Sequence, residues 1–412
     1  MRRSLVFRVL TCVCLLALWL PAHAQVSAGD TGRGPQTITE AQRRELERIG
    51  TLGYTVGGDH APPSSGLTLR DGEAYEGYTV YVSADFAGAF LLDMDGNTLH
   101  TWRDTTSLNW TRVWVYPDGC VLGVTAYPGR LLKLDSDSEG VWMYGDDSLV
   151  AHHDVRVSPD GSIYAVMRVA RQWDWYRDFP ILNDMVCILD PRGSTADERL
   201  CLSIPKAFHV SRYSDWVTSP EFLQRGPDPF HTNTVEVLDG AVPHPAFKSG
   251  NILITVRNMD CIAVLDPGSE HVVWANRGRW QRPHEARVTP EGRLLLFDNR
   301  KFDGQSRVVE YDVVADEIVW EYTEPGFFTP GSGAAQLLPN DNVLITESRK
   351  GRIFEVTREG RVVWEYWNPR TTDGGDSVVR ITRAFRLPYD YFEGAFAEHL
   401  DECSRSRGAR SR

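Results

Sequence analysis

Three histidines stand at the beginning of strand-like segments, where each could act as a base, a nucleophile or a metal ligand. His153 precedes DVRVSPDG, His231 precedes TNTVEVLDG and His284 precedes EARVTPEG. Arg257 follows the apolar run ILITV in the block of His231. Neutral imidazole is available near pH 7 because its reference pKa is about 6.5. A guanidinium is permanently charged and presents a forked donor set that matches oxyanions. Imidazoles gathered around such a cation would suit chemistry on an anionic group.

Three kinds of chemistry fit this set of side chains. Three histidines can bind zinc, or the set can simply hold an anion. Alternatively, one imidazole can attack an electrophilic sulfur or phosphorus centre while the other groups neutralise the oxygens of the transferred group. A neighbouring arginine disfavours zinc, because a fixed positive charge repels a second cation. We therefore predict no metal and no cofactor. A single histidine at a strand start is most often an ordinary hydrogen-bonded residue, so the prediction depends on whether the three meet.

A repeated block is the feature that would bring them together. Each block has a short alternating strand, a turn of the Pro-Asp-Gly type, an apolar strand, a strand ending near Asp and, in most blocks, a strand with Trp. Repeats of about 40–45 residues with four antiparallel strands are typical of β-propeller blades. Trp274, Trp320 and Trp364 recur at one place, where we expect them to pack between blades. The complete blocks begin at Thr111, His153, His231, His284 and Gly333.

The two ends of the repeat region each contain part of a block. Gly77 to Trp102 supplies only the last three strands, and TRAFRLP (Thr382 to Pro388) resembles the missing first strand. A blade made from both ends would close the ring and leave no exposed sheet edge. We therefore predict an all-β fold, a six-bladed β-propeller over residues 76–390 with four-stranded antiparallel blades.

The turn proline sets the register of the blocks. Six positions before it stand Thr111, His153, His284, Gly333 and Thr382. The block of His231 lacks the proline, and we assign His231 to the same place. Equivalent positions of successive blades circle a common axis, so the three histidines are predicted to face one another at one mouth of a channel.

The second strand of each block runs back to the same mouth. Seven positions past the turn glycine it reaches Arg168, Arg257 and Asn299, which we place beside His153, His231 and His284 respectively. His152 is one position out of register and is predicted to point away from its neighbour. The mouth is thus expected to be cationic, which favours an anionic ligand.

The N-terminus has the pattern of an export signal. It carries Arg2, Arg3 and Arg8, an apolar run and the small-x-small site Ala22-His23-Ala24. We predict a signal peptide over residues 1–24, cleaved near Ala24, and a periplasmic or secreted protein without stable membrane insertion. The chain has a net charge of −12, and loss of the three leader arginines leaves −15. Such an acidic chain is not expected to bind nucleic acid.

Residues outside the repeats are polar. We interpret residues 25–75, with the helical stretch EAQRRELERIG, as a linker or cap. Residues 391–412 are interpreted as a C-terminal tail whose last residues, SRSRGARSR, are basic and solvated. Five cysteines follow the leader, so complete pairing within the chain is excluded. Cys187 and Cys201 stand on neighbouring predicted strands, where they could form a disulfide or pack as small apolar residues.

Several blocks resemble the bacterial arylsulfate sulfotransferase family: HHD (His152 to Asp154), FHTN (Phe230 to Asn233), RPHEARVTPEGRLLLFDN and GAAQLLPNDNVLITES with GRIFEVTREGRVVWEYWNP. The similarity covers nearly all of residues 77–388. It implies a six-bladed periplasmic propeller that moves a sulfuryl group from a phenolic sulfate ester to a phenol, without a nucleotide donor. The partners would be these small molecules, and the sequence does not define an oligomeric state.

The resemblance also implies a role for each matched residue. His284 matches a nucleophile that becomes transiently sulfurylated. His153, His231 and Arg257 match groups that hold the sulfuryl oxygens and assist proton transfer. Lesser substrate contacts are expected from Asn233, Thr382, Asn299 and Arg168.

Two other functions remain open at this point. One is a non-catalytic periplasmic propeller that binds an anionic ligand or a protein partner. The other is a quinone-dependent dehydrogenase, prompted by the Trp-bearing segments LDPGSEHVVW and DVVADEIVW. Six blades disfavour this last function, because the usual quinone-dependent form has eight.

Overall fold

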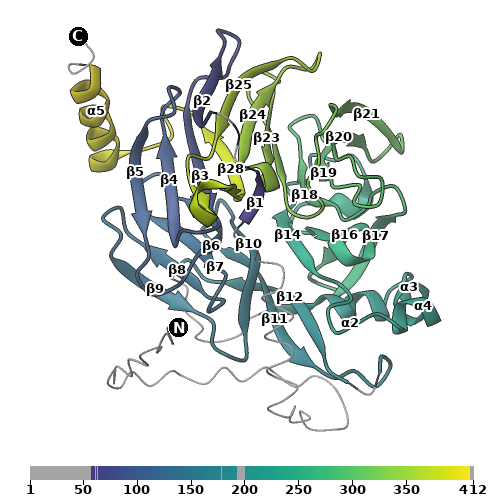
Figure 1. The fold of residues 1–412 in the computed structure, drawn as a ribbon. Helices are drawn as coiled ribbons and strands as arrows, with labels where there is room; N and C mark the ends of the chain where they lie inside the picture. Colours follow the sequence, from purple (N-terminus) through teal and green to yellow (C-terminus); the bar gives the residue numbers. More distant parts are fainter. Residues whose placement is uncertain (1–56, 61, 63, 178, 193–199, 409–412) are drawn as a thin grey trace, which may run out of the picture. The chain divides into compact units, whose positions relative to one another are not determined.

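The computed structural model describes residues 57–60, 62, 64–177, 179–192 and 200–408 (Figure 1). The predicted signal peptide, its cleavage site and the stretch EAQRRELERIG lie outside the described residues.

Six antiparallel sheets make up most of the described chain, and five of them are built from consecutive strands. The second sheet contains β6 (Trp110–Val115), β7 (Val121–Thr125), β8 (Leu131–Leu134) and β9 (Gly140–Tyr144). The third contains β10 (Val150–Val157), β11 (Ile163–Arg171), β12 (Ile181–Leu189) and β13 (Leu200–Ser203). The fourth contains β14 (Thr232–Val237), β15 (Ile252–Val256), β16 (Cys261–Asp266) and β17 (His271–Arg277).

The fifth sheet contains β18 (His284–Val288), β19 (Leu294–Asp298), β20 (Arg307–Asp312) and β21 (Glu317–Tyr322). The sixth contains β22 (Ala334–Leu337), β23 (Val343–Glu347), β24 (Arg352–Val356) and β25 (Val362–Trp367), with β2 (Gly66–Arg70) as a fifth strand. A small further sheet joins β1 (Gly57–His60), β27 (Ser377–Val379) and β26 (Thr371–Thr372). The predicted all-β class with four-stranded antiparallel sheets is confirmed.

The first sheet combines the two ends of the repeat region. Its order is β28 (Ile381–Leu387), β3 (Tyr78–Ser83), β4 (Gly88–Leu92) and β5 (Thr98–Arg103). Leu387 pairs with Tyr78, and Ala384 pairs with Tyr81. The strand that β3 lacks in the sequence is therefore supplied from the far end of the chain. The number of blades and the closure of a ring stay predictions.

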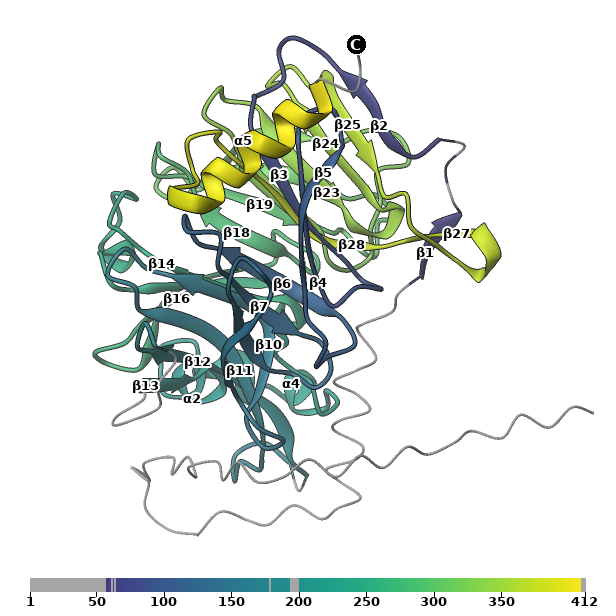
Figure 2. The same cartoon turned by 90° about the vertical axis from the view of Figure 1, so that its left-hand side faces the viewer.

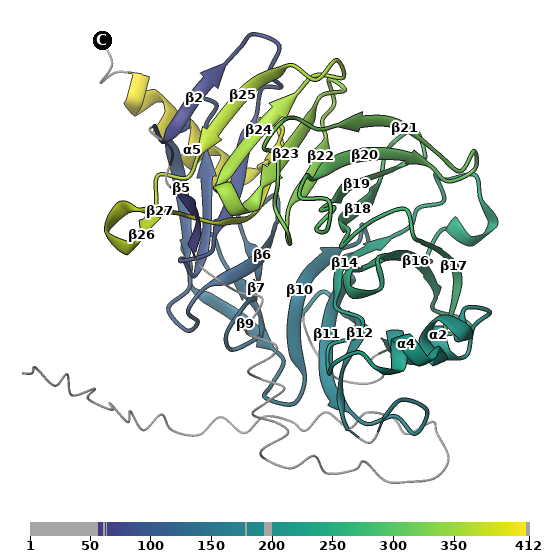
Figure 3. The ribbon, with the colours of Figure 1, turned by 45° about the vertical axis from the view of Figure 1, so that its right-hand side comes forward.

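The first strand of each sheet contacts the first strands of its neighbours in the chain. β10 contacts β6 and β14, and β18 contacts β14 and β22 (Figure 3). β28 contacts β22 and β6. We call these six the inner strands. Their amino-terminal ends carry the histidines, so the way they pack decides which side chains meet.

Tryptophans link neighbouring sheets, as expected for the recurring Trp. Trp364 Nε1 donates to the Met94 carbonyl at 3.0 Å, and Trp320 Nε1 donates to the Arg358 carbonyl at 2.9 Å. Trp102 makes the same kind of bond to the Gly119 carbonyl at 2.8 Å. Each indole thus packs apolar area between sheets and satisfies its own N–H.

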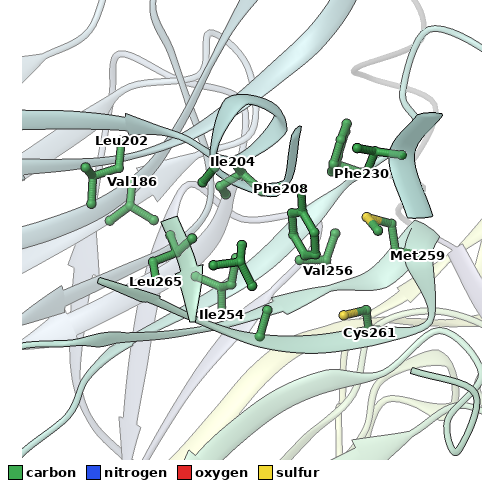
Figure 4. Packing of buried hydrophobic residues seen from close by; sticks show 14 of the residues in the cluster. Val186, Leu202, Ile204, Phe208, Phe230, Ile254, Val256, Met259, Cys261 and Leu265 are labelled. Carbon is green, nitrogen blue, oxygen red and sulfur yellow. The ribbon is translucent and has the colours of Figure 1, made fainter. Parts of the chain in front are cut away.

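A helical insertion leads the chain to His231. It consists of α2 (Ile204–His209), α3 (Ser214–Thr218) and α4 (Pro220–Leu223). The Ser203 side chain caps α2 by accepting from Lys206 N–H, and Pro205 suits the first turn. Phe208 and Phe230 are fully buried in the cluster that Figure 4 shows against Val256. The short 3-10 turns are η1 (Pro245–Phe247), η2 (Arg257–Met259), η3 (Ser348–Lys350) and η4 (Asp373–Gly375).

The segments outside the repeats differ from expectation. β2 extends the sixth sheet, so part of the expected linker is a strand. Residues 394–408, expected as a solvated tail, form α5 (Gly394–Gly408), which lies against β5 (Figure 2). Phe396 and Leu400 are buried there because their spacing of four places both on one helix face. The basic residues SRSRGARSR at the end of the chain favoured a solvated tail, whereas the apolar stripe precedes them.

Two further observations bear on the protein's environment. Cys187 and Cys201, paired across β12 and β13, form a disulfide. Among the residues that the structure describes, no helix combines the length and apolarity needed to span a bilayer.

The pairing of β28 with β3 can be tested at Gly77. A methyl group there would lie 2.3 Å from the Leu387 carbonyl oxygen in β28, whereas one at Gly72 would meet nothing within 4 Å. We expect Gly77→Ala to lower the free energy of unfolding by about 1–3 kcal/mol, because the strands must separate locally. Gly72→Ala should change it by less than about 0.5 kcal/mol. Urea unfolding measures both, and equal stabilities would contradict the pairing.

Candidate functional site

Three imidazoles form a compact buried cluster. The Nε2 atoms of His153 and His231 lie 2.8 Å apart. The ring of His152 packs 3.9 Å from that of His153 and 5.1 Å from that of His231, between centroids. The predicted approach of His153 to His231 is therefore present. The expectation that His152 points away from its neighbour is wrong.

A backbone irregularity explains the position of His152. The pairing of β10 with β11 is interrupted between Ala151 and Val155, and His153 has the left-handed φ of 59°. Such a bulge breaks the alternation of side chains along a strand, so consecutive residues can lie on one side. A prediction based on strict alternation had to misplace His152.

His231 is not at the repeat position assigned to it. Val155 pairs with Ala165 and Val235 with Ile254, each partner standing four residues after its turn glycine. Val155 and Val235 are therefore equivalent, and Asn233, two residues before Val235, matches His153. The connection from β14 to β15 lacks the proline and is longer, spanning residues 238–251 against 158–162 between β10 and β11, which shifted the register read from the sequence. His231 reaches the cluster from the segment before β14, with a left-handed φ of 55°.

Carboxylates and a guanidinium hold the cluster. The His231 Nδ1–H donates to the Asp228 carboxylate, which leaves the Nε2 lone pair to accept from His153. Arg168 donates to His152 Nε2 and, at 3.2 Å, to Asp184. Arg168 thus lies beside His152, whereas the register had placed it beside His153. Asp184 also accepts from the backbone N–H of Thr232 at 2.6 Å, next to His231.

His284 is held separately at the start of β18. Its Nδ1–H donates to the Arg282 carbonyl at 2.9 Å and to Asn299 Oδ1 at 2.6 Å. Its Nε2 accepts from the backbone N–H of Ser332 at 3.0 Å. Asn299 therefore lies beside His284, as predicted. Both ring nitrogens are engaged, and Nε2 carries the lone pair.

Arg257 lies beside His231, and its guanidinium has an N–H donor without an acceptor among the described residues. Its backbone N–H donates to the His231 carbonyl at 3.1 Å, which places it beside His231 as predicted. Its Nε is buried and has no acceptor among the described residues. Burial and then the charge of Arg282 lower the pKa of Arg257 to about 10, so it stays charged at pH 7. The charge of Arg257 in turn acts on His284.

The imidazoles are neutral near pH 7. Burial is the largest cause that lowers the pKa of His152, His153 and His284 well below 6.5, and neighbouring positive charges add to it. Burial also lowers the pKa of His231, to about 4, although the charge of Asp228 opposes the shift. Burial raises the pKa of Asp184 to about 6, whereas His231 and Arg168 keep that of Asp228 well below its usual range despite its burial. Neutral imidazoles beside a charged guanidinium can act as nucleophile or base toward an anion.

Two predicted residues form hydrogen bonds away from the imidazoles. Asn233 Nδ2 donates to the Pro283 carbonyl at 3.2 Å, which supports the backbone just before His284. Thr382 Oγ1 donates to the Val82 carbonyl at 3.3 Å. The sequence reasoning missed Asp228, Asp184 and Ser332. Asp228 could have been found from the sequence, because a carboxylate three residues before His231 is close enough to bind it. Nothing in the sequence pattern pointed to Ser332.

His152, His153 and His231 are close enough together to bind one metal ion, since one ring nitrogen of each lies within 4.8 Å of the others. However, Arg168 donates to His152 Nε2, which occupies one of the two ring nitrogens that could bind a metal. The charges of Arg168 and Arg257 both act on His152. These cations disfavour a divalent ion at the cluster.

The fold and this arrangement define an all-β protein with a buried histidine and arginine site. The family model for arylsulfotransferase (ASST) matches residues 126–369, so the chain belongs to the arylsulfotransferase family. That range contains the four histidines and Arg257. No protein of curated function matches the chain.

Solved structures resemble the chain only distantly. A protein of unknown function from Bacteroides caccae is 11% identical, with 74% of this chain and 97% of that chain covered and a TM-score of 0.49. The β-propeller domain of Cps50 (Swd1) from Myceliophteria thermophila is 10% identical, with 77% and 90% covered and a TM-score of 0.45. Virginiamycin B lyase from Staphylococcus aureus is 12% identical, with 63% and 69% covered and a TM-score of 0.38. Likenesses at this level carry no functional argument.

The buried neutral imidazoles should make stability depend on pH. Their folded pKa values lie below the unfolded value of about 6.5, so the unfolded chain binds more protons in acid. The stability that they contribute is complete above about pH 6.5 and is lost as the pH falls through the folded pKa values. Each group can contribute at most about 1.4 kcal/mol per pH unit below pH 6.5.

Urea unfolding between pH 7 and pH 5 measures this slope. His284→Gln should make it shallower, whereas His271→Gln, at an exposed position, should leave it unchanged. If the free energy of unfolding depends on pH equally in both variants and in the unmodified protein, the inference that His284 is buried in its neutral form would be contradicted.

Proposed function

We propose that this chain is an exported, nucleotide-independent aryl-sulfate sulfotransferase that uses a sulfohistidine intermediate on His284. The observation that carries the proposal is the meeting of buried neutral imidazoles with Arg257, whose Nε has no acceptor among the described residues. Membership of the arylsulfotransferase family supports a sulfuryl group as the anion. Donor and acceptor are then a phenolic sulfate ester and a phenol.

We propose that the six sheets are the blades of one closed propeller over residues 76–390. The contacts between inner strands and the pairing of β28 with β3 support this arrangement. We also propose that residues 1–24 direct export to the periplasm or the medium. The Cys187–Cys201 disulfide supports an oxidising compartment.

In the first half-reaction, His284 Nε2 attacks the sulfur of the aryl sulfate. An N–S bond forms, the S–O bond to the aryl oxygen breaks, and the bonding pair leaves with the phenolate, which is protonated on release. In this proposal, Arg257 neutralises the oxygens of the sulfuryl group as that group is transferred. Asn299 and the Arg282 carbonyl keep the proton on Nδ1, so that Nε2 is the attacking atom.

In the second half-reaction, an acceptor phenol gives its proton to His231 Nε2 and its oxygen attacks the sulfur. The N–S bond breaks and its electron pair returns to His284. Asp228 orients His231 through Nδ1–H and stabilises the imidazolium that forms. His153 N–H occupies His231 Nε2 in this structure, so the acceptor hydroxyl would take its place.

The Ser332 N–H must also give way, because it donates to the lone pair that attacks. Ser332 and Gly333 have left-handed φ values of 65° and 115°. We propose that donor binding breaks this hydrogen bond and shifts the segment around Ser332, whose N–H can then serve a sulfuryl oxygen.

The test of the nucleophile is the covalent intermediate. Brief exposure to p-nitrophenyl sulfate should add one sulfuryl group to the unmodified protein, mapped to His284 by peptide mass. His284→Ala should lose both the adduct and transfer to phenol, because it removes the proposed nucleophile. His271→Ala, at an exposed position, should retain both. An adduct that persists in His284→Ala would refute the assignment.

Asp228 should affect the second half-reaction alone. Asp228→Asn keeps an acceptor for the His231 Nδ1–H but removes the charge that raises the pKa of His231. We expect steady-state transfer to fall about 10²-fold, with a retained initial burst of nitrophenol and accumulation of sulfurylated protein. Asp174→Asn, at an exposed position, serves as the control. Loss of the burst together with turnover would place Asp228 in donor binding instead.

A non-catalytic propeller that binds an anion is the second candidate. The engagement of both ring nitrogens of His284 favours it, because no lone pair is free at this residue. On this hypothesis an aryl sulfate would bind with neither adduct nor release of phenol.

A further inference from the structure

A cavity lies at the ends of the inner strands away from the histidines. It has a volume of about 320 Å³, near the lower end of the usual range for small-molecule sites. β6, β10, β18, β22 and β28 contribute to its wall, together with Tyr391. It shares no lining residue with the histidine cluster or Arg257.

The strand pattern places the charged residues of this cavity. The third residue after His153 is Arg156, and the third after His284 is Arg287. In the equivalent place the other inner strands carry Trp114, Glu236, Gln336 and Phe385. This layer of side chains lies two residues further along each strand than the layer of Asp154, Glu285 and Arg383. Members of both layers line the cavity.

The buried charges around the cavity do not balance. The ion pairs here join four arginines to three carboxylates: Arg112, Arg156, Arg287 and Arg383 with Asp154, Glu236 and Glu285. This leaves one positive charge in excess within the network. A buried excess charge is costly unless a counter-charge is near.

Arg156 carries the excess. Its nearest carboxylate oxygen, Oε1 of Glu285, is 3.7 Å away, and its guanidinium makes no hydrogen bond to the described residues. Its side chain is only 22% exposed. Arg287, by contrast, donates to Asp154 at 2.7 Å, to Glu285 at 2.8 Å and to the Val235 carbonyl at 2.6 Å.

Arg383 adds a second unused donor beside it. Its side chain is 10% exposed, and its Nε has no acceptor among the described residues. Both arginines line the cavity. Two guanidinium groups with spare N–H donors at one cavity suit an anionic oxygen pair.

The rest of the wall is aromatic and apolar. Arg156 lies over the ring of Trp114, with its Cζ 5.6 Å from the ring centroid, and Arg383 lies 5.6 Å from that of Phe385. Tyr391 and Leu337 complete this side. Such walls favour a flat hydrophobic body over a hydrated inorganic ion.

We infer that this cavity binds a small aromatic anion, with its charged group on Arg156 and Arg383 and its ring between Trp114, Phe385 and Leu337. The ligand's charge balances the network, and its oxygens accept from the spare donors. The site is independent of the sulfuryl transfer proposed above, because it uses none of the same residues.

Calorimetric titration of the mature protein with benzoate tests the inference, with benzamide as the neutral ligand of the same shape. We expect benzoate to bind and benzamide to bind at least about tenfold more weakly, because it lacks the charge. Arg156→Gln should weaken benzoate about tenfold. Leu337→Trp, which fills the cavity without removing a charge, should abolish binding.

Arg257→Gln is the matched control, since it removes a guanidinium from the histidine site alone. It should leave benzoate affinity unchanged. Equal affinity of Arg156→Gln and the unmodified protein, no difference between benzoate and benzamide, or loss of binding in Arg257→Gln would each overturn the inference. Loss of sulfuryl transfer in His284→Ala bears on the other site and leaves this result unaffected.

Discussion

The buried ion pairs between the inner strands are the interaction on which the site depends. Asp154 and Glu285, both almost completely buried, follow His153 and His284 directly in the chain. Glu285 accepts from Arg112 and Arg287 and pairs with Arg383 at 2.7 Å, so it ties β18 to β6 and β28. Loss of one partner would leave an uncompensated charge in a medium of low dielectric constant. The histidines are thus fixed through their neighbours rather than through their own rings alone.

The same burial sets the chemistry of the imidazoles. A cluster of basic side chains beside Arg168, Arg257 and Arg282 would repel protons even in water, and desolvation adds to this effect. Neutral imidazole then coexists with charged guanidinium over the whole physiological range. A charged guanidinium beside neutral imidazoles suits chemistry on an anionic group once the hydrogen bonds to the imidazole lone pairs are exchanged. The charge of Asp228 is the main influence that raises the pKa of His231 against the effect of burial.

The repeat made much of this predictable from sequence. Turn residues and alternating apolar strands predicted the antiparallel sheets, and the register placed Asn299 beside His284 and Arg257 beside His231. The failures lie where the backbone departs from regular geometry. The bulge at His153 turned His152 into the cluster. The longer connection after β14, which lacks the turn proline, hid that Asn233 rather than His231 stands at the repeat position. Asp228 and Ser332 come from an insertion and a connecting segment, whose conformations no strand periodicity encodes.

The histidine site and the cavity at the other ends of the inner strands both follow from the alternation of side chains along these strands. Side chains alternate along each inner strand after the repeat position. The first and third residues after it face the interior that the strands share. The second residue after it is buried between sheets, as Val113, Val155 and Val235 are. The first interior layer holds Arg112, Asp154, Glu285 and Arg383, which neutralise one another. The second layer has Trp114, Gln336 and Phe385 in place of further carboxylates, so the charge of Arg156 is left without a close partner. The two layers are only two residues apart along each strand. The ion pairs that stabilise the histidine end of the strands therefore also shape the cationic cavity at the opposite end.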